Sequence, residues 1–184
     1  MSILKALVDL IVEEGPGTIS IPQVAARADV SVRTVYHYFP SKEALFDGLT
    51  SSMSSLVDTT DGGVPPTPRS PSELVEAMPA AYRHLEANAR MFRALSVSEL
   101  GGRIESSRRP ERLGRIDAAL GPIRDRLDDG EYRRLRAIVG LIASFDGYDG
   151  LTGVWGLTRD EAAEAAAWAL RTLTDRARRS GVAT

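Results

Sequence analysis

Six side chains that can hydrogen-bond to bases or phosphates lie close together near the start of the chain. They are Arg33, Thr34, Tyr36, His37, Tyr38 and Lys42. Arginine, lysine and hydroxyl groups donate to phosphate oxygens, and an arginine fork can pair with two acceptors of one guanine. The first five of these fall on one short helix, where so many polar groups would make a poor core. We therefore interpret this segment as a surface that reads DNA, against the alternative of a solvated helix face.

Two short helices and a tight turn must position these side chains. Ser20 begins the first helix, with a glutamine three residues later as its capping-box partner. After the turn, Ser31 offers a fresh N-cap for a second helix expected over 32–39. Val35 and Phe39 are one helical turn apart and form the buried side of that helix, so the polar residues point outward.

One helix precedes this pair and another follows it. Apolar residues recur at helical spacing from Ile3 to Val12, and the sequence of residues 15–17, Gly-Pro-Gly, ends that helix. Ser41 caps a fourth helix expected to run to about Thr59. This helix is long enough to leave a DNA-binding head, enter a second domain and act as a mechanical link.

The ordered segment resembles the DNA-binding module of the tetracycline-repressor (TetR-type) family of bacterial regulators. The family pattern is V-S-x-x-T-Φ-Y-x-x-F-x-S-K-E-x-L, where Φ is apolar. The matching residues are Val30, Ser31, Thr34, Val35, Tyr36, Phe39, Ser41, Lys42, Glu43 and Leu45. The resemblance implies an all-α fold, with an N-terminal three-helix helix-turn-helix head and a C-terminal helical domain for ligand binding and dimerisation.

The residues expected to bind DNA are two helix-capping serines and the six polar side chains. They are Ser20, Ser31, Arg33, Thr34, Tyr36, His37, Tyr38 and Lys42. The resemblance implies phosphate or base contacts by Thr34, Tyr36 and Lys42, while Arg33 and His37 are better candidates for reading bases. Many relatives carry lysine and glycine in place of Val32 and Arg33, so the sequence preference cannot be transferred. Tyr36 alternatively packs its ring under the helix and reaches a phosphate only with its hydroxyl.

The charge of this head is unusual for a DNA-binding domain, which is normally basic. Up to Asp58 the sequence has four basic residues against seven acidic ones. The first helix begins almost at Met1, without the basic arm that often precedes it in the family. Either the start has been trimmed or mis-set, or the protein binds without that arm. An alternative therefore stays open: a ligand-binding or protein-interaction module of the same fold that has lost effective DNA binding.

The remainder of the chain has a helical pattern throughout. Residues 59–71 concentrate proline, glycine and threonine, which predicts a mobile loop. We place the DNA-binding domain at 1–47 and a helical effector-binding and dimerisation domain at 48–184. Helices are expected over 74–87, 89–100 and 111–127. Helix breaks are expected near Asn88, Gly101-Gly102, Gly121-Pro122, Asp128-Asp129-Gly130 and the series Gly147, Gly150, Gly153 and Gly156.

Methionine and aromatic side chains on the middle helices could line a pocket for an apolar effector, whose identity the sequence does not reveal. Ordinary core packing explains these residues almost as well. The candidate pocket residues are Met53, Met78, Tyr82, Met91, Phe92, Ile116 and Phe145.

The last two helices are the candidates for self-association. Residues 135–145 are apolar around most of a helix, which implies burial on more than one side. A capping box at Thr158 begins an alanine-rich helix whose small side chains permit close approach. We expect 131–146 and 159–178 to pair across a two-fold axis in a homodimer, as the resemblance implies. The alternative is that both helices complete the chain's own core.

Composition argues against several classes of protein. The 184 residues contain no cysteine, which excludes disulfides and thiolate catalysis, and only two histidines, at 37 and 84, too few for a persuasive metal site. The sequence shows no glycine-rich phosphate loop and no nucleophile beside a base. No apolar run is long enough to span a membrane. We expect a cytoplasmic regulator with no cofactor, no enzymatic activity and double-stranded DNA as its partner.

Overall fold

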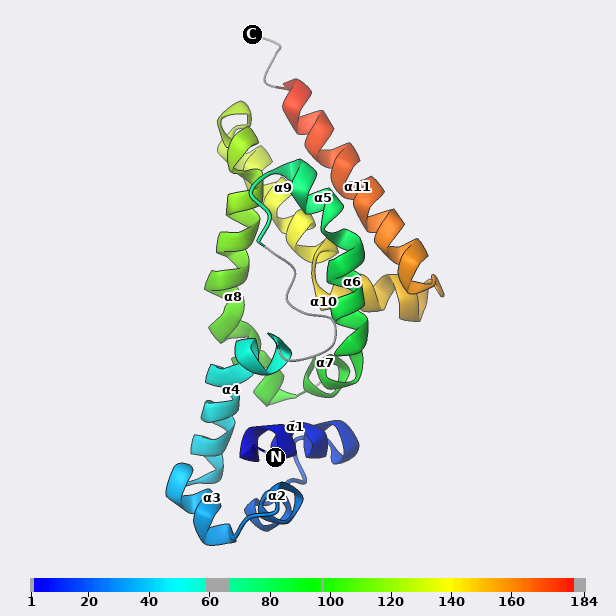
Figure 1. Cartoon of the computed structure of the whole chain (residues 1–184). Helices are drawn as coiled ribbons and strands as arrows, with labels where there is room; N and C mark the ends of the chain where they lie inside the picture. Colours follow the sequence, from blue (N-terminus) through cyan, green and yellow to red (C-terminus); the bar gives the residue numbers. More distant parts are fainter. Residues whose placement is uncertain (1, 59–66, 97, 181–184) are drawn as a thin grey trace. The chain divides into compact units, whose positions relative to one another are not determined.

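A computed structural model describes residues 2–58, 67–96 and 98–180 (Figure 1). Within these ranges every regular element is helical, which confirms the predicted all-α fold class. The helices form two compact units. The head unit spans Met1–Thr60 and Asn88–Arg108, and the second unit spans Asp61–Ala87 and Arg109–Thr184.

The head unit is built from six helical segments. They are α1 (Ile3–Glu14), α2 (Ile21–Ala28), α3 (Val32–Tyr38), α4 (Lys42–Asp58), α7 (Ala89–Ser96) and the first part of α8 (Glu99–Leu120). Its core joins the apolar face of α1, including Leu7 and Ile11, to Val24, Val35 and Leu45 of the next three helices. Four further core residues come from beyond the N-terminal segment: Met91, Leu95, Leu100 and Ile104. The head unit therefore includes residues 88–108, which we had assigned by sequence to the second domain.

The second unit contains the remaining helices. They are α5 (Pro71–Glu76), α6 (Met78–Ala87), the later part of α8, the 3-10 helix η1 (Gly121–Arg126), α9 (Asp129–Ile142), α10 (Phe145–Asp149), the π-helical segment η2 (Gly150–Val154) and α11 (Arg159–Ser180). Helix α11 packs along α5 and α6. The fully buried Tyr82 hydroxyl donates to the carbonyl oxygen of Ile142 at 2.9 Å, and its ring meets Tyr148 edge-on at 5.5 Å between centroids. These contacts tie α6 to the junction of α9 and α10.

Several predicted helix boundaries are confirmed by hydrogen bonds. Helix α6 ends and α7 begins on either side of Asn88. Asp128 caps α9 through a complete capping box with Glu131. At α11 the Thr158 N–H donates to the Glu161 carboxylate at 2.8 Å, while the Glu161 N–H donates to the Thr158 hydroxyl. Most of the predicted mobile loop, 59–71, lies outside the described residues.

The break expected near Gly101-Gly102 lies earlier in the chain, because α7 ends at Ser96 and α8, which begins at Glu99, passes through both glycines without interruption. The structure gives a reason for the misreading. A Cβ on Gly101 would collide with the backbone of Leu95, so glycine here permits close approach of two chain segments and does not end a helix. Residues 111–120 belong to this same helix, and 121–126 form the separate η1.

The glycine series after α9 also differs from expectation. Gly147 lies inside α10, and Gly150 and Gly153 lie inside η2. A Cβ on Gly147 would collide with the carbonyl oxygens of Leu141 and Ile142, which again indicates close backbone packing. Only Gly156 of this series adopts a left-handed conformation, with φ of 69°, and there the helical path does stop.

The apolar circumference of α9 predicts burial on more than one side. Within one chain the helix is not buried in this way. Val139 is fully buried, but Ile138 is 45% and Leu141 53% exposed. Trp168 on α11 is 67% exposed. A single chain therefore leaves large apolar side chains of both helices in contact with solvent.

Candidate nucleic-acid interface

The turn between α2 and α3 is held by backbone hydrogen bonds and one unusual residue. The capping box predicted at Ser20 is complete: the Ser20 N–H donates to the Gln23 side chain at 2.8 Å, and the Gln23 N–H is directed at the Ser20 hydroxyl. Asp29 ends α2 in the left-handed region with φ of 57°. The Val30 N–H then donates to Ala25 O at 3.0 Å. The chain reverses sharply and enters α3.

Ser31 fixes the start of α3. Its hydroxyl accepts from the Thr34 N–H at 3.0 Å and lies 2.8 Å from the Thr34 hydroxyl, so the two hydroxyls are hydrogen-bonded to each other. A serine N-cap of this kind contributes about 1 kcal/mol to helix stability. The hydroxyls of both predicted DNA-binding residues are therefore already engaged in holding the helix.

The side chains of α3 are arranged around the buried Val35. Arg33 and His37 lie two residues on either side of it, about 200° around the helix, and point away from the core. Both are exposed, as is Tyr38, whose ring meets the His37 ring edge-on at 5.3 Å. Arg33 has no hydrogen-bond or ion-pair partner among residues 2–58, 67–96 and 98–180. Its five donors are free to engage a ligand.

Tyr36 and Lys42 occupy intermediate positions. Tyr36 is 49% exposed, so half of its surface is covered by the head and the rest is accessible. Lys42 begins α4 and is half-buried, with its Nζ 5.5 Å from the centroid of the Phe46 ring. The ammonium thus makes a cation–π contact with the ring and can still donate hydrogen bonds.

Sequence reasoning overlooked Val32 as a candidate contact residue. It is the first residue of α3, directly before Arg33, and its side chain is exposed. An exposed apolar side chain beside an arginine can contact a thymine methyl group in the major groove. The helical position of Val32, one turn from Tyr36, is the signal that could have identified it.

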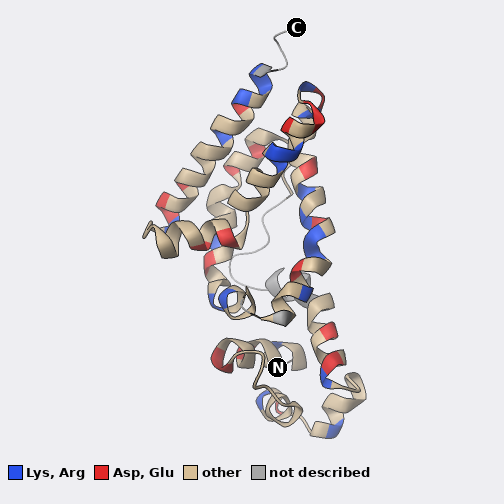
Figure 2. Ribbon diagram, turned by 180° about the vertical axis from the view of Figure 1, so that it is seen from behind, with Lys and Arg blue, Asp and Glu red and all other residues tan. Residues whose placement is uncertain are grey.

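Lysine and arginine residues are few in the N-terminal segment of the head, where the ribbon of Figure 2 marks them in blue, and some of them form ion pairs. The Arg27 guanidinium of α2 donates to both carboxylate oxygens of Glu13 on α1, one at 2.9 Å. This hydrogen bond lowers the pKa of Glu13 below its usual value. On α4, Asp47 pairs with Arg103 of α8. Arg27 thus braces α1 against α2, which leaves Lys5, Arg33 and Lys42 as the N-terminal cations for a ligand.

The eight residues predicted to bind DNA all lie in the head unit, in or next to α2, α3 and α4. The predicted effector residues are not gathered in the same way. Met91 and the half-buried Phe92 belong to the packing of the head unit. The others with described side chains, Met78, Tyr82, Ile116 and Phe145, belong to the second unit. Met53 lies in the part of α4 whose side chains are outside the described residues.

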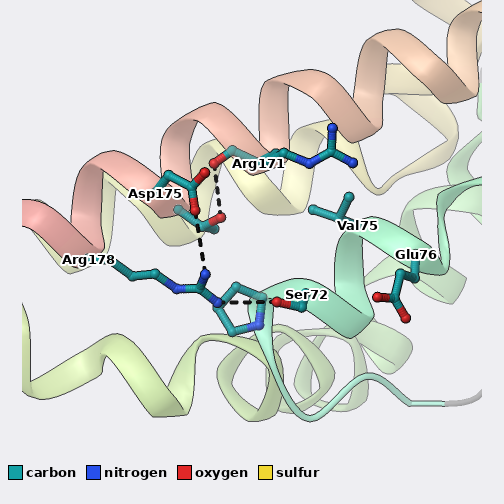
Figure 3. A pocket seen from close by; sticks show the side chains of 8 residues that line it. Ser72, Val75, Glu76, Arg171, Asp175 and Arg178 are labelled. Atoms are coloured by element: carbon teal, nitrogen blue, oxygen red, sulfur yellow. Dashed lines mark hydrogen bonds and ion pairs between the residues drawn. The ribbon is translucent and has the colours of Figure 1, made fainter.

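A shallow pocket in the second unit lies between α5 and α11 (Figure 3). Its volume is about 230 Å³, and none of the predicted effector residues lines it. Arg178 spans it, donating to Ser72 and to Asp175. Ligand pockets commonly measure about 300–1,000 Å³ and are largely apolar. This polar depression is smaller, and its charged groups partly satisfy one another.

Helices of the described residues are too short or too polar to cross a membrane. In the same residues, no cluster of histidine and carboxylate side chains has the makings of a metal site.

Comparisons with known proteins agree with the geometry of the head. Residues 3–49 match the bacterial regulatory proteins of the tetR family. Among solved structures, a TetR transcriptional regulator from Rhodococcus sp. RHA1 is similar, with 21% sequence identity and a TM-score of 0.51. The match covers 94% of this chain and 92% of that one, and at this identity it shows a shared fold. A search of curated proteins gives no significant match.

Proposed function

We propose that this chain, whose residues 3–49 match the bacterial regulatory proteins of the tetR family, is a ligand-responsive repressor that binds a palindromic operator as a homodimer. The outward face of α3 carries this proposal. Arg33 and His37 point directly away from the buried Val35, and the Arg33 donors have no partner among the described residues. A helix of this kind enters the major groove with its exposed side chains against the base edges.

We assign different tasks to the contact residues. Arg33 reads guanine through two parallel hydrogen bonds, and His37 reads a neighbouring base. Tyr36, through its hydroxyl, and Lys42, through its ammonium, contact phosphates and set the position of α3 on the duplex. Because Lys5, Arg33 and Lys42 are the cations available within residues 1–58, correct placement must compensate for the acidic balance of this segment.

The proposed dimer forms through α9 and α11. The exposed Ile138 and Leu141 of α9 and Trp168 of α11 support it, because large apolar side chains lose their contact with water in such an interface. Two recognition helices related by a two-fold axis would enter successive major grooves. The simplest arrangement places half-sites about 34–36 Å apart.

Regulation would come from an apolar effector bound in the second unit, where Met78, Tyr82, Ile116 and Phe145 are found. The effector would favour a spacing of the two heads that no longer matches the operator, with α4 as the lever. A coupling of about 1–3 kcal/mol is enough to change DNA affinity about 5- to 150-fold. The protein would act in the cytoplasm, on bacterial DNA.

Selection from a pool of random DNA duplexes at moderate salt tests the proposal without knowledge of genome or effector. Recovery of one palindrome would support a dimeric, sequence-specific regulator and would give the half-site spacing. Recovery of a single half-site would contradict the dimer alone, and no enrichment would contradict operator binding.

The excess of acidic residues up to Asp58 favours a second candidate function, in which the same fold binds a ligand or protein but no longer DNA. The two candidates differ in their salt dependence. Contacts with several phosphates make DNA affinity fall steeply as salt rises, because counterions are released on binding. A steep slope with a selected sequence would argue against the second candidate.

A further inference from the structure

We infer that residues 105–115 of α8 form a hinge between the head unit and the second unit. Helix α8 is continuous from Glu99 to Leu120 (Figure 1), and the border between the two units falls within it, after Arg108. At the border that follows Ala87, by contrast, α6 ends and a new helix begins. A rigid helix across a border would hold two units in one orientation, so the stiffness of α8 decides whether they can move.

Each end of α8 is held by contacts within one unit. In the head unit, Ile104 is buried in the core. In the second unit, Ile116 is buried, and Asp117 accepts hydrogen bonds from Tyr132 at 2.8 Å and from Arg136 at 2.6 Å, which fixes α8 to α9. The two units therefore control opposite ends of the same helix.

The helix between these anchors contributes no buried side chain to either core. From 105 to 115, about three helical turns, every side chain is exposed except Arg108, Leu113 and Arg115, which are half-buried. The sequence of this stretch, ESSRRPERLGR, is mostly polar and charged. Most helical stability in proteins comes from the packing of an apolar face, and ion pairs on an exposed helix contribute little. The backbone here receives scarcely any support from tertiary contacts.

Pro110 interrupts the hydrogen bonds of α8 next to the border. Proline has no N–H, so the Ser106 carbonyl oxygen receives no hydrogen bond from position 110, and the ring crowds that carbonyl group. The Ser106 hydroxyl donates to Gly102 O at 2.9 Å, a contact that often bends helices. Sharp kinks in helices occur mainly at such prolines. The helix is therefore weakened close to the point where it passes from one unit to the other.

Gly114 weakens the same stretch without a packing reason. A Cβ at this position would meet nothing within 4 Å, whereas a Cβ on Gly101 or Gly147 would collide with backbone. Glycine in an exposed helix interior is unfavourable because it loses more backbone freedom on folding than any other residue. Segments with few buried contacts open locally without unfolding the rest of the protein. Proline and glycine thus lie in the part of α8 on which no core depends.

For the regulator proposed above, the hinge would supply the freedom that a change in head spacing requires. Only this consequence rests on the proposed function, because the hinge itself is a property of the free chain. Hinge motions between domains take microseconds to milliseconds. The hinge in α8 would yield while α4 acts as the lever.

Hydrogen–deuterium exchange of the full chain without DNA tests the local opening. We expect the amides of 105–115 to exchange at least about tenfold faster than those of 116–120. The double variant Pro110→Ala/Gly114→Ala removes both weak points and should slow exchange in 105–115 at least about tenfold. Gly102→Ala is the matched control, because Gly102 is an exposed glycine of the same helix whose Cβ would also meet nothing within 4 Å, but it precedes the hinge. It should have little effect on exchange in 105–115.

Pulsed electron paramagnetic resonance tests whether this opening reorients the units. The chain has no cysteine, so spin labels would attach only to Ala26→Cys in α2 and Arg83→Cys in α6, two exposed positions in different units. Dilution of labelled chains with unlabelled wild type restricts the measurement to distances within one chain. We expect a broad distance distribution that narrows in the double variant and stays broad in Gly102→Ala.

Equal protection along 105–120, or a wild-type distance distribution no broader than that of the double variant, would overturn the hinge. Both measurements need neither operator nor effector, so a failed operator selection would leave them decisive. The role in regulation is tested separately, on the selected operator and on one with an extra base pair between its half-sites. The double variant should discriminate between these spacings at least about fivefold more strongly than wild type. Equal discrimination would overturn the role in regulation and leave the hinge.

Discussion

At the scale of single residues, hydrogen bonds distinguish side chains of the head that support the fold from those that we propose to contact DNA. Ser31 and Thr34 bond to each other at the start of α3, and Arg27 is engaged by Glu13. Arg33 and His37 project from the opposite face and take no part in this support. The residues that we propose for base recognition can therefore be removed while leaving the fold intact, which makes them suitable for mutation.

Arg33→Ala should remove discrimination at one base pair of the operator, at a cost of about 1–3 kcal/mol against the preferred base. Lys42→Ala should instead weaken binding to all sequences and reduce the slope of log affinity against log salt by about one. Affinities for the operator and for its single-base variants at several salt concentrations measure both effects. Equal loss on every sequence for Arg33→Ala would show that Arg33 contacts phosphate.

Tyr36→Ala should weaken DNA binding without separating the dimer, because Tyr36 lies on the exposed part of α3. Tyr36→Phe removes only the hydroxyl and keeps the half-covered ring, so it isolates the phosphate contact. Operator affinity and sedimentation of both variants give the comparison. Tyr36 would be a structural residue if Tyr36→Ala lost the dimer. The same would follow if Tyr36→Ala unfolded while Tyr36→Phe kept full operator affinity.

At the scale of elements, the orientation of α3 depends on a contact with α4. Phe39 follows α3 directly, and its ring lies against Gly48: a Cβ on that glycine would be 2.5 Å from Phe39 Cε1. No methyl group fits there unless the ring moves. The glycine thus permits a close approach of Phe39, at the end of α3, to α4.

Gly48→Ala should displace Phe39, alter the angle of α3 and weaken operator binding, although residue 48 itself is remote from the exposed face of α3. Gly102→Ala in α8 is the matched control, since its Cβ would meet nothing within 4 Å. That control should gain about 0.5–1 kcal/mol of stability and keep full affinity. Thermal unfolding and operator titration distinguish the two, and unchanged affinity in Gly48→Ala would mean that Phe39 adapts without moving α3.

The same scale shows what the sequence could reveal and what it could not. The caps at Ser20, Ser31 and Thr158 were predicted correctly, because each involves residues within three positions of one another. Gly101 and Gly147 were misread as helix breaks. Their role is to admit a carbonyl group from a neighbouring segment, which depends on packing in three dimensions. Local patterns carry the first kind of information and not the second.

At the scale of the whole molecule, one buried hydroxyl links stability to alkaline pH. Burial raises the pKa of Tyr82 to about 12, above the ordinary value of 10.0. Because the pKa is raised in the folded state, the stability that the neutral Tyr82 hydroxyl contributes is complete below pH 10 and is lost as pH rises towards 12. The free energy of unfolding should therefore fall over this window by on the order of 2–3 kcal/mol from Tyr82.

Tyr82→Phe should lower stability at pH 8 by about 1–2 kcal/mol, because the Ile142 carbonyl loses its donor. It should also flatten the decline above pH 10. A residual decline is expected from Tyr132, whose pKa is raised by burial and by its hydrogen bond to Asp117. Denaturant unfolding at pH 8, 10 and 11 measures both effects, and parallel curves for Tyr82→Phe and wild type would contradict the assignment.

The exposure of Ile138 and Leu141 could not be predicted from the sequence. The pattern of 135–145 indicates that many sides of α9 avoid water, but not whether the cover comes from the same chain or from another. Likewise, Met91 and Met78 are both apolar middle-helix residues, yet they belong to different units. Assignment to a unit depends on contacts between distant segments.

The core of the head also imposes an order on biosynthesis. Met91, Leu95, Leu100 and Ile104 complete the packing that α1 to α4 begin, with residues of the other unit encoded between them. As the chain leaves the ribosome, α1 to α4 emerge first, but their core can be completed only after Ile104 has emerged. During that interval their apolar faces remain exposed to solvent. A ribosome stalled short of that point would therefore present a head still accessible to proteases, whereas one stalled well beyond it would present a protected one.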